Sequence, residues 1–264
     1  MSDTPAEPID ALRRAVQMVR AGKARRAISA IHDAVGSTEV IWNGCRFRVT
    51  PKDNATDRHL WEHGVPDEGA SIDALLRVVA GQKVRFFDIG GNSGLFSVAV
   101  AHHAAPGSMV TAFEPNPVMA ARLRDNVALN DLGSVVTVEE CALGDTPGEA
   151  TLNIFEGNLG RATLFGADPR AKDRQISVPV GTLDTFWPAQ ADDRLGVFKL
   201  DVEGHEAAAL APWLQAMDRF ASVHHILMEV THSDRWSHDV VGDLRDAGYA
   251  EAFRGEGNVL MSRV

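Results

Sequence analysis

The sequence is poor in cysteine and has no apolar run long enough to cross a membrane. Only two cysteines, Cys45 and Cys141, occur among 264 residues, far apart and without the spacing of metal ligands. We therefore expect reduced, buried thiols rather than disulfides or a zinc site. The N-terminus also lacks an apolar signal core, so a soluble, cytoplasmic protein is expected.

Basic residues are outnumbered, because 26 Lys and Arg stand against 36 Asp and Glu, which gives a net charge of −10. This balance disfavours nonspecific binding to nucleic acids and membrane surfaces, which are themselves anionic. Repeats and low-complexity segments are also absent, and an apolar content of 45% is sufficient for a full core. A small molecule is the expected partner.

From residue 84 onward, apolar strands alternate with helices. Strands are predicted over 84–89, 108–114, 135–143, 195–202 and 223–230. Helices are predicted over 93–104, 117–130, 205–217 and 239–248. Continuous apolar strands that alternate with helices indicate an α/β fold with a mostly parallel sheet covered on both faces. Residues 249–255 and 258–264 predict a terminal antiparallel pair.

The chain divides into an extension and a main domain. Residues 1–80 predict an N-terminal extension with a helix over 7–35 and a β-hairpin over 39–50. The helix is expected to pack on the main domain or on a partner, so a homodimer through this extension is one expectation. Residues 81–264 form the predicted main domain. Within it, residues 148–186 break the strand–helix alternation and predict an inserted β flap that covers the substrate.

A carboxylate and three glycines follow the first strand of the main domain, in the stretch VRFFDIGGNSGLFS over residues 84–97. Ligands of open α/β sheets bind at the carboxyl ends of the strands. The next strand ends in Glu114, where a carboxylate accepts hydrogen bonds from both hydroxyls of a ribose. The two features together predict a ligand that contains a nucleoside.

The glycine spacing distinguishes two classes of nucleoside ligand. Asn92 occupies the second glycine position of the dinucleotide motif G-x-G-x-x-G, and the spacing is Asp88-x-Gly90-x-x-x-Gly94. An acid before the glycines would repel a pyrophosphate, but it suits the ammonium and sulfonium groups of S-adenosylmethionine directly or through water. An NAD(P)-dependent oxidoreductase remains an alternative, although the single tyrosine, Tyr249, has no lysine four residues later. A non-catalytic S-adenosylmethionine-binding partner protein is another.

Several stretches, in order over about residues 84–230, resemble the FkbM family of S-adenosylmethionine-dependent methyltransferases. They read FDIGGNSGLFS, AFEPNP, CALGD, VPVGTLDTF, FKLDVEGHE and ILMEV. The resemblance implies a Rossmann-like class I methyltransferase fold and an O-methyltransferase that acts on a hydroxyl or carboxylate of a sugar, polyketide or other natural product.

The resemblance also implies positions for the cofactor. Its methionine end would lie against Asp88, Gly90 and Gly94, its ribose at Glu114, and its adenine near Cys141 and Ala142. The full set of expected cofactor contacts is Asp88, Gly90, Gly91, Asn92, Gly94, Glu114, Pro115, Cys141, Ala142 and Asp201.

A cluster of acids and a histidine ends the strand GVFKLDVEGHE over residues 196–206. Asp201, Glu203 and His205 are the catalytic candidates there, and Glu229 ends the following strand. His205 is expected at a helix start, where the positive end of the helix dipole keeps imidazole neutral and able to accept a proton. Asp201 or Glu203 would orient it.

Two further interpretations concern the same edge of the sheet. No metal is expected, but in an alternative mechanism Asp201, Glu203 and Glu229, together with His205, bind Mg²⁺ that activates a hydroxyl. The expected substrate contacts are Asn158 and Arg161 in the flap and His232 just beyond Glu229. An arginine would suit an anionic group on the substrate.

Overall fold

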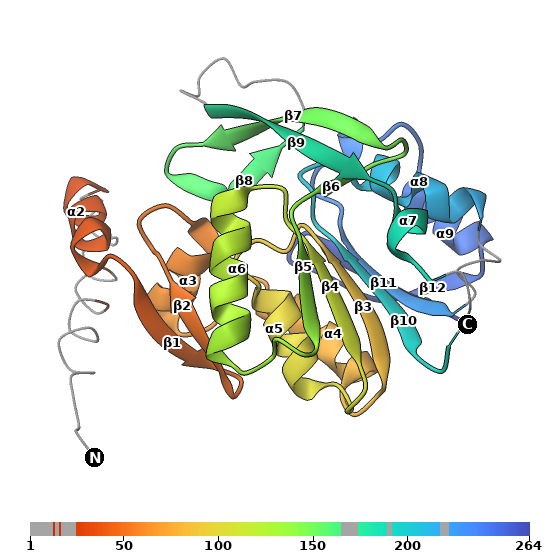
Figure 1. The fold of residues 1–264 in the computed structure, drawn as a ribbon, viewed down its shortest axis with the longest axis horizontal. Helices are drawn as coiled ribbons and strands as arrows, with labels where there is room; N and C mark the ends of the chain where they lie inside the picture. The colour runs from red at the N-terminus through yellow and green to blue at the C-terminus, as the bar shows by residue number, and fades with distance from the viewer. Residues whose placement is uncertain (1–12, 14–15, 17–24, 165–173, 189–191, 217–221) are drawn as a thin grey trace.

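A seven-stranded sheet forms the centre of the protein (Figure 1). The computed structural model describes residues 13, 16, 25–164, 174–188, 192–216 and 222–264. Side by side, the strands are β12 (Tyr249–Gly255), β13 (Asn258–Arg263), β11 (Val223–Glu229), β10 (Leu195–Leu200), β3 (Val84–Ile89), β4 (Met109–Phe113) and β5 (Val136–Glu139). Of these seven strands, β13 alone runs in the direction opposite to the other six. The predicted mostly parallel sheet with a terminal antiparallel pair is confirmed. In this pair β12 forms the edge of the sheet, and β13 lies between β12 and β11.

Helices cover both faces of the sheet. Along β3, Val84 and Phe86 point to one core, whereas Phe87 and Ile89 point to the other, as the two-residue period of a strand requires. The first core is covered by α4 (Gly69–Val79), α5 (Leu95–His103) and α6 (Pro117–Leu129). The second is covered by α7 (Leu183–Phe186), α8 (Glu206–Gln215) and α9 (Val240–Asp246). Within the described ranges, no helix has both the length and the apolar character that a membrane crossing needs.

The N-terminal part packs onto the first core. It consists of α2 (Arg25–Val35), β1 (Thr38–Trp42), β2 (Cys45–Val49) and α3 (Ala55–His63). Phe47 and Trp61, both buried, belong to the same apolar cluster as Phe86 of the central sheet. The residues that precede α2 lie almost entirely outside the described part. The division of the chain at residue 80 stays a prediction, although this part shares its core with the main sheet.

A second sheet lies across the carboxyl ends of the parallel strands (Figure 1). Its strands, in spatial order, are β6 (Ala142–Leu143), β9 (Arg174–Gly181), β7 (Gly148–Phe155) and β8 (Asn158–Thr163). The edge strand β8 is attached to the start of α3, since the Leu159 amide donates to the Asp53 carbonyl at 2.7 Å and the Ala55 amide donates to Asn158 Oδ1 at 3.0 Å. We call this second sheet the flap; residues 165–173 of the predicted flap lie outside the described residues.

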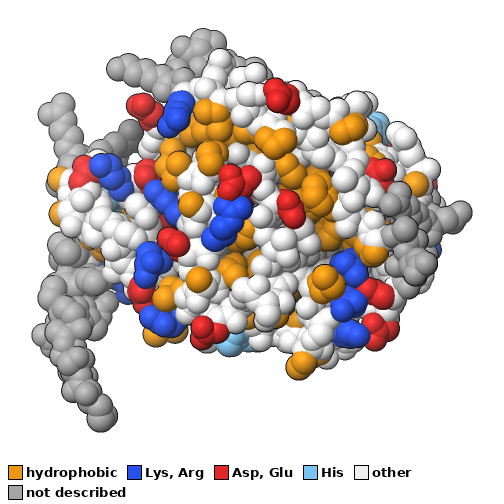
Figure 2. Space-filling view, in the orientation of Figure 1, with side chains coloured by type: hydrophobic (Ala, Val, Ile, Leu, Met, Phe, Trp, Pro, Cys, Tyr) orange, Lys and Arg blue, Asp and Glu red, His pale blue; other side chains and the backbone are white. Residues whose placement is uncertain are grey.

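The surface carries charges of both signs. On the face drawn in Figure 2, Lys and Arg side chains lie beside Asp and Glu side chains rather than forming one continuous basic area. Ion pairs of this kind include Arg122 with Asp53 at 2.8 Å and Lys83 with Asp193 at 2.7 Å.

The ends of β3 and β10 approach each other very closely. Gly90 has φ +84°, and a Cβ placed on it would lie 1.9 Å from the carbonyl oxygen of Asp201. The Asp201 amide in turn donates to the Ile89 carbonyl at 3.0 Å. Only glycine permits both the left-handed backbone and this contact. The first glycine of the loop is therefore required by strand packing.

Substitution of Gly90 by alanine tests this contact. We expect Gly90→Ala to lower the free energy of unfolding by about 3 kcal/mol or more, because the added methyl group forces two strands apart. The matched control is Gly81→Ala, since Gly81 has φ +70° but open space around it; it should cost only about 1 kcal/mol of backbone strain. Urea denaturation measures both, and equal losses would contradict the close approach.

Candidate functional site

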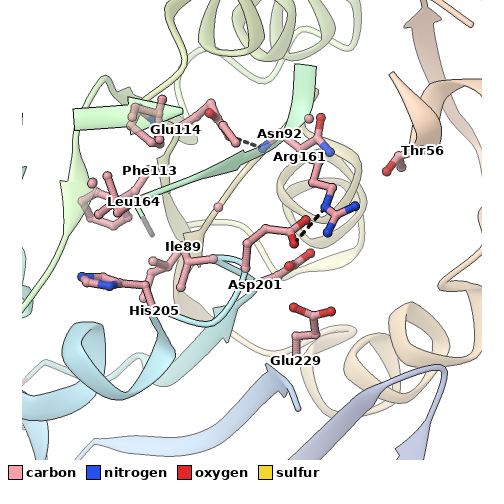
Figure 3. Close-up of a pocket in the computed structure, with 18 of the residues that line it drawn as sticks. Thr56, Ile89, Asn92, Phe113, Glu114, Arg161, Leu164, Asp201, His205 and Glu229 are labelled. Carbon is pink, nitrogen blue, oxygen red and sulfur yellow. Dashed lines mark hydrogen bonds and ion pairs between the residues drawn. The ribbon is translucent and has the colours of Figure 1, made fainter. Parts of the chain in front are cut away.

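A pocket lies at the carboxyl ends of β3, β4, β10 and β11, beneath the flap (Figure 3). Most of the predicted site residues line it. They are Gly90, Asn92, Glu114, Pro115, Cys141, Ala142, Asn158, Arg161, Asp201, Glu203, His205 and Glu229. Four predicted residues lie outside its wall: Asp88, Gly91, Gly94 and His232. Distant parts of the chain converge here because parallel strands end at one edge.

The backbone amides of the glycine loop, residues 90–94, are all engaged within the protein. Two of them donate to the Phe113 carbonyl, both at 3.0 Å, and the Asn92 amide donates to Glu114 at 2.8 Å. The remaining two donate to Asn92 Oδ1 at 2.9 Å and to the Gly91 carbonyl at 2.8 Å. A dinucleotide site needs such amides for its pyrophosphate. The loop amides therefore leave no free donor for a pyrophosphate.

Glu114 is buried at the pocket wall after β4. One carboxylate oxygen accepts from the Asn92 amide and the other from the Asn116 amide, each at 2.8 Å. Burial raises the pKa of this carboxyl to about 7, although both amides and Lys199 act to lower it. Each oxygen keeps a further lone pair. The carboxylate can thus accept two hydroxyl hydrogen bonds, as the predicted ribose contact requires.

Asp88 does not face the pocket, which corrects the expected direct contact with a cationic ligand. Its fully buried carboxylate accepts from Ser97 Oγ at 2.6 Å and lies 3.3 Å from Lys199 Nζ. The cation paired with Asp88 is therefore Lys199 of the protein itself, and not the ligand. Gly91 and Gly94 do not line the pocket because they face α6 instead: an added Cβ at either position would meet Leu123 of that helix. Both glycines permit close packing of that helix.

Lys199 is a site residue that the sequence analysis missed. It is buried in β10, and Nζ donates to the Gly90 carbonyl at 2.8 Å and lies 3.9 Å from Asp201 Oδ2. Burial acts to lower its pKa, but Asp88, Asp201 and Glu68 together raise it above the ordinary value. The available signal was a lone lysine inside an apolar strand, which is costly unless it is paired.

The turn after β10 is strained and held by a structural acid. Glu203 and Gly204 have φ values of +55° and +100°. The buried Glu206 carboxylate accepts from the amides of Val202 at 2.9 Å and Gly204 at 3.2 Å, and from Trp236 Nε1 at 2.8 Å. A left-handed non-glycine residue persists only when its surroundings hold it. Glu206 therefore stabilises the turn that carries Glu203 toward the pocket.

The catalytic candidates separate into two groups within the pocket. The imidazole of His205 lies on the side of Ile89 and Leu164, whereas Asp201, Glu229 and Arg161 gather on the other side (Figure 3). Burial lowers the pKa of His205, against the effect of Glu206 and Asp145. The imidazole is accordingly neutral near pH 7 and can accept a proton.

Glu203 has other partners than the histidine we expected it to orient. Its Oε2 lies 3.2 Å from His232 Nε2 and 3.6 Å from Arg161 Nε. The expected contact between Glu203 and His205 is therefore not formed. His232, predicted as a substrate contact, acts on the pocket through Glu203. Together these three side chains connect the flap to the turn after β10.

Further acids reach the pocket from segments that the sequence analysis did not assign to it. These are Asp67 and Glu68 before α4 and Glu256 before β13. Burial raises the pKa of Glu68 to about 7, with a further rise from Asp201. Such residues give no local signal, because they join the site only through contacts distant in sequence.

Glu229 Oε2 is buried and has no hydrogen-bond donor among the described residues. Burial, together with Asp201 and Glu203, raises the pKa of this carboxyl to about 8. The alternative metal site at Asp201, Glu203 and Glu229 is not supported by their arrangement. Within the described part of the chain, no group of three or more acidic, histidine or cysteine side chains has metal-binding geometry.

The remaining wall is largely apolar. Ile89, Phe113 and Leu143 line it beside Cys141. Burial raises the pKa of the Cys141 thiol to about 11, so the thiol stays neutral and unreactive. A flat aromatic base fits such a surface. This wall lies next to Glu114, as a base must lie next to its ribose.

Comparisons with known proteins point to one family. The family described as the methyltransferase FkbM domain matches residues 88–250. The methyltransferase sdnD of Sordaria araneosa is 35% identical over 117 residues, which cover 44% of this chain and 42% of that protein. The 31-O-demethyl-FK506 methyltransferase FkbM of Streptomyces tacrolimicus is 27% identical over 245 residues, which cover 81% of this chain and 86% of that protein.

A solved structure is similar as well. The crystal structure of a methyltransferase FkbM from Methylobacillus flagellatus KT has 17% identity, a TM-score of 0.44 and coverage of 68% of this chain. The chain spans 43% of that protein and 42% of sdnD, so it corresponds to less than half of either.

The raised pKa values predict an unusual dependence of stability on pH. The unfolded carboxyls are ionised above about pH 5, whereas the folded protein retains protons on Glu68, Glu114, Glu203 and Glu229 near pH 7. Where the folded state binds more protons, stability falls as pH rises. Between pH 7 and pH 8.5 we expect the ligand-free protein to lose about 1–2 kcal/mol of unfolding free energy.

Urea denaturation at several pH values measures this loss. Glu229→Gln is the informative variant, because an amide does not titrate and the loss should shrink. A stability that is constant or increases over this pH range would show that these carboxyls are ionised in the folded protein.

Proposed function

Because the chain belongs to the FkbM methyltransferase family and folds as a class I methyltransferase, we propose that it transfers a methyl group from S-adenosylmethionine to an oxygen of a small molecule. The acceptor group is a hydroxyl or a carboxylate, on a sugar, a polyketide or another natural product. The relative from Streptomyces tacrolimicus is, by its name, a methyltransferase of 31-O-demethyl-FK506, which fits an oxygen acceptor.

The observation that carries the choice of cofactor is the glycine loop. Its amides are already bonded within the protein, so no bare backbone is left for a pyrophosphate. A nucleoside is supported by Glu114, whose carboxyl group can bind ribose hydroxyls, and by the apolar residues that line the pocket beside it. A nucleoside without phosphate, whose other end is cationic, fits a pocket lined by Asp201, Glu68 and Glu229, because a bound cation would favour the ionised forms of these carboxyls.

The proposed orientation follows from these walls. The adenine lies along Phe113 and Cys141, the ribose at Glu114 and the amino-acid end toward Asp201, which leaves the sulfonium between the two sides of the pocket, facing both His205 and Glu229. When bound, S-adenosylmethionine supplies a methyl group on a sulfonium, whose departure leaves a neutral thioether. The residues of this chain must therefore align the acceptor and, for a hydroxyl, remove its proton.

The acceptor is proposed to enter beneath the flap. Arg161 reaches the pocket from β8 and lies 5.5 Å from the ring of Phe155. Asn158 also lines the pocket, although its Oδ1 is used by the Ala55 amide. These contacts support the flap as the cover of the acceptor and Arg161 as the flap residue that contacts it.

We assign proton removal to His205, whose neutral imidazole lines the pocket at the start of α8. Glu229 is the second candidate, because its Oε2 lacks a donor among the described residues. Its pKa, raised to about 8, leaves less of it deprotonated near pH 7, so it is less available there to accept a proton. The two side chains lie on opposite sides of the pocket, so their variants are separable (Figure 3).

Ligand binding tests the cofactor assignment. We expect S-adenosylmethionine and S-adenosylhomocysteine to bind and NAD(H) not to bind, as measured by calorimetry. Glu114→Ala should weaken binding by about 1.5–3 kcal/mol, because the partner of two ribose hydroxyl groups is removed. Glu140→Ala, at an exposed position that pairs with Arg124, is the matched control. Preferential NAD(H) binding would instead favour the oxidoreductase alternative.

Turnover tests the assignment of His205. With an acceptor found in a panel of hydroxylated and carboxylated natural products, His205→Ala should reduce the turnover number about 10²–10⁴-fold. Its affinity for S-adenosylhomocysteine should stay unchanged, and His238→Ala, on the surface, should turn over normally. If Glu229→Gln is inactive while His205→Ala is not, the base is Glu229. Cofactor binding without methyl transfer to any acceptor would favour the non-catalytic alternative.

A further inference from the structure

Lys199 links the two central strands where they reach the pocket. It lies opposite Asp88 in the register of β10 and β3, and both side chains are buried on the same face of the sheet. Nζ lies 3.3 Å from Asp88 Oδ1, 2.8 Å from the Gly90 carbonyl and 3.9 Å from Asp201 Oδ2. An ammonium group has three donors. In Lys199 these donors face Asp88, which lies outside the pocket, the Gly90 carbonyl of the glycine loop, and Asp201, which lines the pocket.

Lys199 also serves more than one carboxylate as a counter-charge. Asp88, Asp201 and Glu68 each favour its charged form, and its charge in turn favours the ionised forms of Glu68 and Glu114. These acids come from β3, β10, the segment before α4 and the end of β4. Three of them, Glu68, Glu114 and Asp201, line the pocket. One buried cation therefore acts on the acids of several walls at once.

We propose that Lys199 is a positioning residue for methyl transfer, which holds the Gly90 carbonyl and the Asp201 carboxylate in the arrangement that binds the amino-acid end of the cofactor. The proposal rests on the proposed function, because it assumes that this cofactor occupies the pocket. Lys199 itself does not line the pocket and acts through the two groups that it contacts.

The position of Lys199 separates this role from a general role in stability. A lysine needed only to neutralise Asp88 would require one contact, and Ser97 already donates to that acid at 2.6 Å. The contact with Gly90 and the approach to Asp201 add nothing to that neutralisation. Both contacts lie on the Asp201 side of the pocket, away from Phe113 and Cys141, where the adenine is proposed to bind. Loss of Lys199 should accordingly affect one end of the cofactor more than the other.

Two ligands that differ at that end provide the test. S-adenosylhomocysteine carries the amino-acid group, whereas 5′-methylthioadenosine has the same nucleoside without it. By calorimetry, Lys199→Met should weaken S-adenosylhomocysteine binding about tenfold or more, because polar groups that a charge had positioned are released. Binding of 5′-methylthioadenosine should change little. Lys199→Arg, which keeps the charge, should restore part of the affinity.

Two further variants guard against loss of folding. Asp88→Asn combined with Lys199→Met removes the buried unpaired acid, so this double variant should fold and show the same ligand preference. Arg85→Met is the matched control, because Arg85 lies on β3, pairs with Asp192 at 2.5 Å and does not line the pocket. It should lower the melting temperature without changing the affinity for either ligand.

The outcomes are distinguishable. Equal weakening of both ligands in the folded Lys199 variants would assign the residue a structural role and overturn the proposal. Unchanged binding of S-adenosylhomocysteine would overturn it as well. If both methionine variants fail to fold, the uncharged but polar Lys199→Gln takes their place, and equal weakening of the two ligands by that variant would overturn the proposal. Failure of the wild-type protein to bind S-adenosylhomocysteine would instead reject the proposed function itself.

Discussion

The pairing of Asp88 with Lys199 across β3 and β10 is the interaction on which the site depends. A buried ion pair contributes little net stability, because desolvation offsets the attraction between its charges. Its geometric role is clearer, since the two side chains lie opposite each other where the two strands end side by side. The contact between Gly90 and the Asp201 carbonyl then follows. The pocket residues Gly90 and Asp201 are both in contact with this pair of strands at the point where the strands end.

The walls of the pocket come from segments that are far apart in the sequence. The flap edge β8 is bonded to the start of α3 and to Asn116, whose Nδ2 donates to the Leu159 carbonyl at 2.9 Å. Arg161 and Glu203 connect the flap to the turn after β10. The N-terminal part thus contributes to the enclosure of the site as well as to the core. A structure in which these segments separated would leave the glycine loop open to solvent.

The sequence predicted the features that depend on local pattern. Strand–helix alternation gave the sheet, and the positions of Gly90 and Glu114 at strand ends placed them at one edge. It failed where the direction of a side chain mattered. Asp88 precedes the loop, yet its side chain lies on the face of the sheet that α5 covers, where it contacts Lys199 and Ser97. Glu68 and Glu256 could not be predicted, since only the folded chain brings them to the pocket.

The internal hydrogen bonds of the glycine loop have a consequence for recognition. A loop whose amides already have partners within the protein needs no ligand to hold its shape. Binding then requires little loss of backbone entropy at this wall. The backbone conformation of the loop is thus set by folding, and adaptation to different ligands must come from the side chains around it.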